Sequence, residues 1–267
     1  MTEALVRHVD HVFVPVADPV PLFALFTHTL GLPVAWPIRD DGAFASGGVC
    51  LGNMNIEFVR ADPTLSEYFA ATEPLTVRGI AFEPFADHGW AEALDERKLR
   101  HLGPVPYERE SGVGAAGILS TNTYLGGLVG DAAVAFICHY HSERAVRGRT
   151  AREAMDRADG GAIGVRRVAE ITIGVNDLEK AERRWRRFLS PAEPDGYGLF
   201  RVGKGPAIRL RHSSIEGVAG MWVEVASLAT AREALRERDL LGPIRASGIG
   251  LDYTRTGGLD VWLTEAR

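Results

Sequence analysis

The chain has 267 residues, 46% of them hydrophobic and 24% charged, and its formal net charge is −5. These values are typical of a globular protein and predict no basic surface for nucleic acid. Two cysteines are too few for a disulfide framework, and no apolar stretch is long enough for a membrane span. We therefore expect a cytoplasmic protein that binds neither nucleic acid nor membrane.

The first predicted element is a strand over residues 9–16, where apolar side chains alternate. Because side chains of a strand point to opposite faces in turn, Val9, His11 and Phe13 are expected to face away from Val12. A capped segment with a helical apolar stripe follows, and it ends at a Leu-Gly pair. The strand thus places one histidine among apolar residues.

The same order of strand, cap and amphipathic helix occurs three more times, beginning near residues 78, 166 and 220. Shorter apolar runs bounded by Gly, Asn or Asp follow each helix and predict further strands. Each unit is therefore βαβββ, with fewer strands visible in the third. The unequal spacing of the units argues against a solenoid, whose period would be fixed.

A segment that is first charged and then glycine-rich, residues 142–164, separates the second and third units. It has no strand pattern, and we expect a connector containing one short helix. Units one and two then form a domain over residues 1–141, and units three and four form a second domain over residues 165–267. The predicted fold class is α+β, with two βαβββ units in each domain.

A tandem pair of βαβββ units that opens with "VDHVFVPVAD", a helix and "LG" resembles the vicinal oxygen chelate superfamily. This superfamily includes glyoxalase I, bleomycin-resistance proteins and extradiol dioxygenases. The resemblance covers nearly the whole chain and implies that each curved sheet encloses a groove. It also implies metal ligands on the first and last strand of each unit, with side chains pointing into that groove.

The first unit has ligand-type residues at both of these positions. His11 lies on the first strand and Glu57 on the last. Imidazole and carboxylate are both ligands for divalent metals. In a metal-free version, Glu57 would orient His11, and His11 would act as a general base or donate a hydrogen bond to a ligand.

The second unit lacks such a pair. Its first-strand position is Gly79, which has no side chain to coordinate a metal. Matching Phe136 to Phe58 puts Ala135 at the position of the glutamate. A slip in this register would bring other side chains nearer to the groove, namely Cys138, His139 or His141.

The third and fourth units also lack ligand pairs. The third has Glu170 and Arg209, and we predict an ion pair between them, because an unpaired carboxylate on a groove-facing strand is costly. The fourth has Gly220 and Trp262, which are not metal ligands. Domain two is therefore expected to be a degenerate partner without a metal site.

Two protein ligands rarely hold a metal, so no cofactor is the first expectation. The first functional hypothesis is a small-molecule binder, or a metal-independent enzyme with His11 and Glu57 as its catalytic pair. The alternative is an isomerase, lyase or dioxygenase in which these two residues help to hold iron, zinc, manganese or nickel. Whether the protein is an enzyme stays open, as does the choice between monomer and homodimer. The residues expected to contact the small molecule are Phe13, Asn122, Tyr124 and His139.

Overall fold

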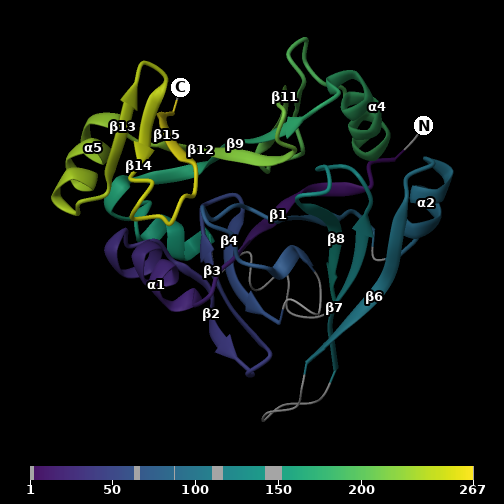
Figure 1. Cartoon of the computed structure of the whole chain (residues 1–267), viewed down its shortest axis with the longest axis horizontal. Helices are drawn as coiled ribbons and strands as arrows, with labels where there is room; N and C mark the ends of the chain where they lie inside the picture. The colour runs from purple at the N-terminus through teal and green to yellow at the C-terminus, as the bar shows by residue number, and fades with distance from the viewer. Residues whose placement is uncertain (1–2, 63–66, 87, 110–116, 142–151, 267) are drawn as a thin grey trace.

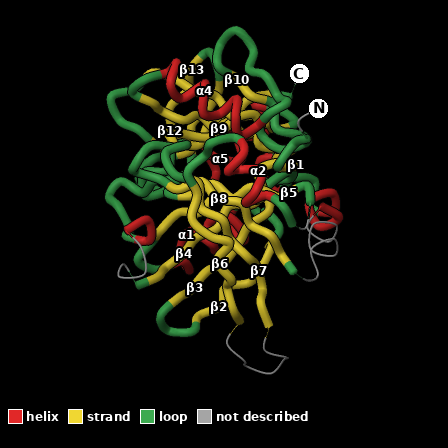
Figure 2. The backbone as a smooth tube through the Cα atoms, turned by 90° about the vertical axis from the view of Figure 1, so that its right-hand side faces the viewer, coloured by secondary structure: helices red, strands yellow, loops and turns green. Residues whose placement is uncertain are grey.

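A computed structural model of the protein describes residues 3–62, 67–86, 88–109, 117–141 and 152–266. Two mixed sheets with few helices make up this part of the chain, which confirms the predicted α+β class. The two sheets lie one above the other in both orientations of the molecule (Figures 1 and 2). None of the described helices is long and apolar enough to span a membrane.

The first sheet contains eight strands in the order β2-β3-β4-β1-β5-β8-β7-β6. β1 pairs in parallel with β4 and antiparallel with β5, and β5 pairs in parallel with β8. Units one and two therefore join through their first strands, at the centre of the sheet. The bounds are β1 Val6–Pro15, β2 Val34–Asp40, β3 Phe44–Cys50, β4 Asn55–Ala61, β5 Gly79–Pro84, β6 His101–Arg109, β7 Gly117–Leu125 and β8 Val134–Tyr140.

The second sheet repeats this plan with seven strands, in the order β10-β11-β9-β12-β15-β14-β13. Its first strands, β9 and β12, again pair antiparallel at the centre. Unit three contributes only β9, β10 and β11, in agreement with its weaker strand pattern. The bounds are β9 Val165–Val175, β10 Leu199–Phe200, β11 Ala207–His212, β12 Gly217–Val225, β13 Leu241–Arg245, β14 Gly248–Leu251 and β15 Val261–Glu265.

Three helices begin where the caps in the sequence predict, whereas α2 begins after Gly89, which has no capping side chain. Asp18, Asp177 and Ser227 accept hydrogen bonds from backbone N–H groups in the first turns of their helices. Residues 152–157 are helical and belong to the predicted connector, whose residues 142–151 lie outside the described part. The bounds are α1 Pro19–Ala24, the π-helix η1 Leu25–Thr29, η2 Glu67–Phe69, α2 Trp90–Glu96, η3 Gly161–Ile163, α4 Leu178–Leu189 and α5 Leu228–Glu237.

The two sheets share one apolar core. Buried side chains of β1, such as Val12 and Val14, belong to the same contiguous cluster as Ile171 and Ile173 of β9. The outer face of each sheet is thus buried against the other half of the molecule. The opposite face of the first sheet, called the inner face below, is left for a site.

Helix α4 of the second half packs against the first sheet. Its Trp185 is fully buried, with ring contacts to Phe82 of β5 and to Phe188. The indole N–H of Trp185 donates to the carbonyl oxygen of Leu128 at 2.9 Å. A second link is the side-chain amide of Asn53, which donates to the Val168 carbonyl oxygen at 3.0 Å and accepts from the Val168 N–H at 2.8 Å.

Strand β1 contains a bulge. Val9 pairs with Phe82 and His11 pairs with Ala81, so Asp10 is the extra residue of the bulge. The extra residue reverses the alternation of faces. Val9 therefore lies in the core with Val12, and the expectation that it shares a face with His11 is wrong.

The first sheet curls until its two ends meet. Phe44 of β3 and Tyr107 of β6 are separated by five strands of the sheet, yet their ring centroids lie 6.0 Å apart. Phe44 also contacts Phe69 of η2, and Phe69 contacts Phe13 on the central strand β1. The inner face is therefore surrounded by its own strands.

Replacing Trp185 with alanine should destabilise the whole molecule by about 3–5 kcal/mol, because it removes a fully buried ring between the two sheets. The exposed Lys180 on the same helix is the control, and Lys180→Ala should change the unfolding free energy by less than about 0.5 kcal/mol. Denaturant unfolding followed by circular dichroism measures both. Two separate transitions, with only one of them shifted, would contradict a shared core.

Candidate functional site

The inner face of the first sheet is lined mainly by aromatic side chains from several strands. Its buried part is formed by Phe13, Val59, Ala81, Val134, Phe136 and Cys138, and its partly buried part by Phe44, Tyr68, Phe69, Tyr124 and Tyr140. Surfaces of this kind, with a few placed polar groups, suit small organic molecules.

His11 lies at the centre of this face and is only 5% exposed. Its ring has edge contacts with Trp36 and Phe136, at centroid distances of 5.9 and 5.8 Å. Nδ1 donates to Asp10 Oδ2 at 2.8 Å, and Nε2 lies 3.6 Å from Glu57 Oε2. The hydrogen bond fixes the ring orientation, so Asp10 is the residue that positions His11, a role that the sequence assigned to Glu57.

The two carboxylates act on the charge of the imidazole. Burial disfavours the imidazolium, but the hydrogen bond to Asp10 and the charges of Asp10 and Glu57 favour it, and the pKa of His11 is raised. Burial also raises the pKa of Glu57, against the opposing effects of His11 and of a hydrogen bond from Ser46. Each group therefore holds its proton to a higher pH than the free side chain does.

Two glycines make room for the aromatic walls. A Cβ on Gly79 would lie 1.8 Å from the ring of Phe13, and a Cβ on Gly48 would lie 2.4 Å from the ring of Trp36. Real side chains do not approach so closely, so each ring occupies the space that a side chain would need. The position in unit two that corresponds to His11 is thus filled by Phe13.

The register expected for β8 is wrong. Phe136 faces inward and Ala135 lies in the shared core, so matching Phe136 to the core residue Phe58 does not hold. Cys138 faces inward with Phe136. His139, expected to contact the ligand, lies on the other face, with its ring 5.1 Å from that of Trp90 in α2. Alternation along the strand explains both results.

The other residues expected to contact a ligand do share the inner face. Phe13 belongs to the inner cluster, and Tyr124 packs against it with its ring 5.7 Å from that of Phe136. Asn122 is the register partner of the inward-facing Cys138. Its Oδ1 atom is buried and has no hydrogen-bond partner among the described residues, so it is available to a ligand.

Sequence reasoning missed two polar residues of the site. Neither Asp10 nor Tyr140 was named as a site residue, and regular alternation would place Asp10 on the core face. The Tyr140 hydroxyl donates to Asp10 Oδ2 at 3.3 Å, so the carboxylate holds both Tyr140 and His11. The available signal was Asp10 itself, because a carboxylate in a row of core-facing valines is too costly to bury there.

The residues present do not fit a metal at the family position. His11 and Glu57 supply two donors, but Ala81 and Gly79, the partners of His11 and Phe13 on β5, supply none. Among the described residues, no third histidine, cysteine or acidic side chain brings a ligand atom within 4.8 Å of both. Protein metal sites usually need at least three such ligands.

The second sheet has no ligand pair in the corresponding positions. Arg209 Nε lies 2.7 Å from Glu170 Oε2, so the predicted ion pair is present. Trp262 stacks on Trp222, and a Cβ on Gly220 would lie 2.8 Å from the carboxylate of Asp260.

The thiols of Cys138 and Cys50 should be unreactive in the folded protein. They are 3% and 2% exposed, and burial raises both pKa values, which disfavours the reactive thiolate. A disulfide reagent at pH 8 should titrate neither thiol in the native state and both after unfolding in guanidinium. The variant Ser214→Cys, at an exposed position, should add one fast-reacting thiol. Rapid native labelling of Cys138 would instead identify it as an accessible nucleophile.

No family model and no curated protein sequence matches the chain. Solved structures do match it in fold. A hypothetical protein from Staphylococcus aureus aligns with TM-score 0.65 and 10% identity, over 97% of this chain and 99% of that one. An extradiol ring-cleaving dioxygenase from Brevibacterium fuscum aligns with TM-score 0.60 and 14% identity, over 99% and 73%.

A Mn(II)-bound glyoxalase from Novosphingobium aromaticivorans aligns with TM-score 0.60 and 11% identity, over 98% of this chain and 83% of that one. Identities this low establish the fold alone. The paired units, the joining of first strands at the centre of each sheet and these alignments agree, and the chain therefore has the vicinal oxygen chelate fold in its tandem, two-sheet form.

Proposed function

We propose that the inner face of the first sheet binds a small aromatic molecule that carries a hydroxyl or amino group. The observation that carries this proposal is the buried Oδ1 of Asn122, which has no hydrogen-bond partner among the described residues and lies on a mainly aromatic face. A buried acceptor without a partner costs free energy, and a hydrogen-bond donor on a ligand would remove that cost.

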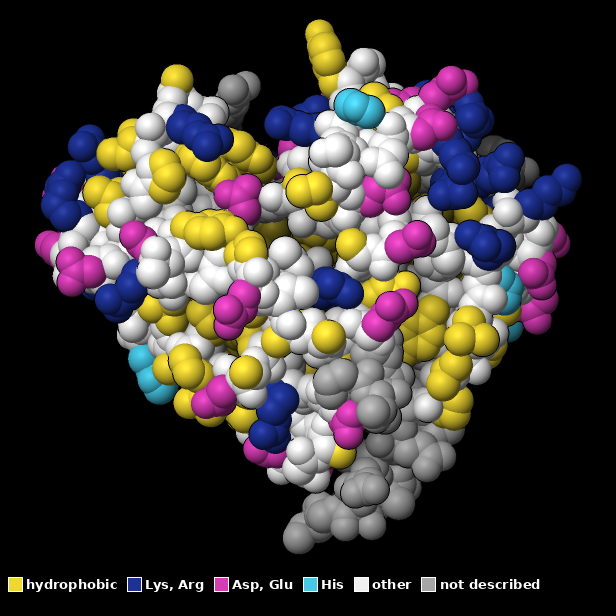
Figure 3. Space-filling model, viewed as in Figure 1, with side chains coloured by type: hydrophobic (Ala, Val, Ile, Leu, Met, Phe, Trp, Pro, Cys, Tyr) yellow, Lys and Arg dark blue, Asp and Glu magenta, His cyan; other side chains and the backbone are white. Residues whose placement is uncertain are grey.

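The charges of the site favour such a ligand over an anionic one. Asp10 and Glu57 bring two acidic groups to the same face, and His11 lies between them as the group of opposite charge. A ligand carboxylate would be repelled there, whereas a neutral hydroxyl or amine can donate to these oxygens. On the face shown in Figure 3, acidic and basic side chains are interspersed.

The chemistry open to this arrangement is binding or proton transfer. His11 and Glu57 both hold a proton more readily than usual, and Asp10 fixes the ring of His11. They are therefore the pair to which we assign acid–base catalysis, if a bound molecule is converted. The metal-dependent isomerase, lyase or dioxygenase has less support, because the donor set at the family position is incomplete.

Phenols and anilines should raise the melting temperature of the protein, because a ligand that binds only the folded state stabilises it, by about 2.7 kcal/mol at 100 times its Kd. Benzoate is the anionic control and should produce no shift. Calorimetry and a thermal-shift screen measure these effects, and mass spectrometry of the recovered ligand separates a binder from an enzyme.

Asn122→Leu should weaken binding by about 1–3 kcal/mol, because the ligand loses its buried acceptor. Asn176→Leu, at an exposed position, is the matched control and should leave binding unchanged. Equal binding by the parent and by Asn122→Leu would overturn the assignment of this site.

A further inference from the structure

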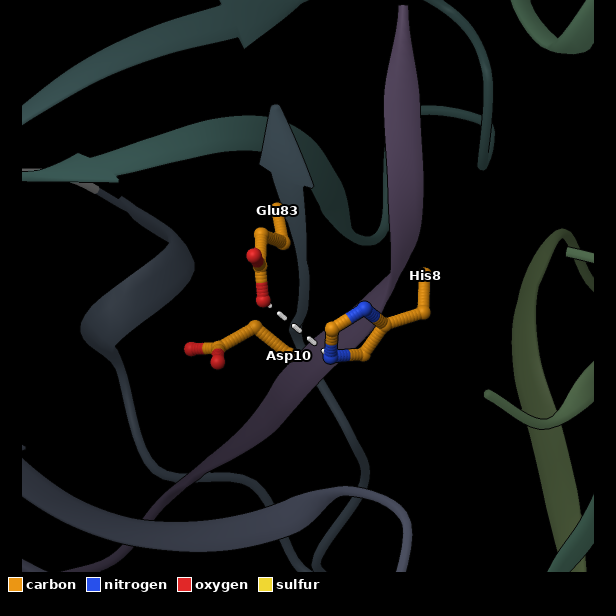
Figure 4. Close-up of side chains that lie close together, drawn as sticks. All are labelled: His8, Asp10 and Glu83. Carbon is orange, nitrogen blue, oxygen red and sulfur yellow. Dashed lines mark ion pairs between the residues drawn. The ribbon is translucent and has the colours of Figure 1, made fainter. Parts of the chain in front are cut away.

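A second group of polar side chains lies next to His11, on the same two strands. His8 of β1 and Glu83 of β5 are register partners, and Asp10 is the bulge residue between His8 and His11. Each of the three offers one ligand atom, and these atoms all lie within 4.8 Å of one another. Figure 4 shows His8 and Glu83 directed toward each other across the strand pair, with Asp10 beside them.

One of these separations matches that of two ligands around one ion. His8 Nε2 lies 3.2 Å from Glu83 Oε2. Two donor atoms that are each about 2.1 Å from a metal, at an angle of about 100°, lie about 3.2 Å apart. His8 and Glu83 therefore have the spacing of a chelating pair, and a carboxylate oxygen of Asp10 lies within 4.8 Å of both ligand atoms.

Two hydrogen bonds hold the carboxylate of Asp10 in place. Its Oδ2 accepts from His11 Nδ1 and from the Tyr140 hydroxyl. Carboxylates that bind metals are commonly held by hydrogen bonds of this kind, which orient them. His11 and Tyr140 would thus form an outer shell around the carboxylate of Asp10.

We propose that His8, Asp10 and Glu83 bind a divalent first-row metal ion such as Zn²⁺ or Mn²⁺. One imidazole and two carboxylates form the nitrogen and oxygen set that these ions accept, and three protein ligands leave coordination positions for water or for an oxygen of a small molecule. This site is separate from the family position at His11 and Glu57, and it does not depend on the aromatic ligand proposed above.

The surroundings make the site rigid but accessible. The side chains of His8, Asp10 and Glu83 are 28%, 17% and 13% exposed. A loop of the second half packs closely on this end of β1, since a Cβ on Gly205 would lie 2.8 Å from the Cβ of His8. The strands β1 and β5 of the first sheet and the loop at Gly205 of the second half therefore hold the ligands in place.

The test compares variants of the full chain that has been stripped with a chelator and dialysed. Titration of Zn²⁺ or Mn²⁺ by calorimetry should give one ion per chain for the parent. His8→Gln and Glu83→Gln should each weaken binding by more than about 100-fold, because even outer-shell groups are worth about 10- to 100-fold. Circular dichroism of each variant confirms that it is folded.

Two controls make the assignment specific. Glu57→Gln removes a donor at the family position, outside the proposed ligand set, and should cost much less metal affinity than His8→Gln or Glu83→Gln. Arg7→Gln removes a cation that lies 3.6 Å from the other oxygen of Glu83, and it should leave the affinity unchanged or raise it.

A parent protein that binds no ion would overturn the proposal. So would a loss of binding in Glu57→Gln while His8→Gln and Glu83→Gln bind normally, because the ion would then lie at the family position. If a variant fails to fold, the NMR spectrum of the parent protein with isotope-labelled histidines decides the question, with substoichiometric Mn²⁺ added. The ring signals of His8 should broaden before those of the distant His212, and equal broadening of both would contradict the site.

Discussion

A carboxylate cannot lie unpaired in an apolar core, and this constraint determines the geometry of the first sheet. One face of β1 is buried against the second sheet, so every residue on that face must be apolar. Asp10 would fall there if the strand were regular. The bulge turns it to the inner face instead, where His11 and Tyr140 donate hydrogen bonds to it.

The same bulge links the two proposed sites. With Asp10 on the inner face, one carboxylate contacts His11 through Oδ2 and adjoins His8 and Glu83. The charge state of each group then depends on that of its neighbours, since acidic and imidazole groups lie within a few ångströms of one another. An ion bound on one side of Asp10 would withdraw electron density from the carboxylate that His11 contacts on the other side.

The sequence was sufficient for the coarse architecture and for part of the site. Repeated strand, cap and helix patterns predicted the four units, and a helix cap such as Asp177 follows from local chemistry. The pairings of His11 with Glu57 and of Glu170 with Arg209 were predictable only through the family resemblance, which places each pair on the first and last strands of one unit.

The errors arose where a single residue changes the register. Alternation assumes a regular strand, and the extra residue at Asp10 moved Val9 to the core and Asp10 out of it. In β8, a match of two phenylalanines favoured a register in which Phe136 faces the core, although the face of a strand depends on its partners. Neither a bulge nor a strand's partners can be determined from apolar spacing within one segment.

The packing of Phe13 over Gly79 also limits how this protein could acquire a full chelating centre at the family position. Any side chain introduced at Gly79 would collide with the ring, since even its first carbon would lie 1.8 Å from a ring atom. A shorter residue at position 13 would have to come first, and by itself it would leave a void among aromatic rings. The two positions are therefore epistatic, and a mutational path to such a centre passes through a destabilised intermediate.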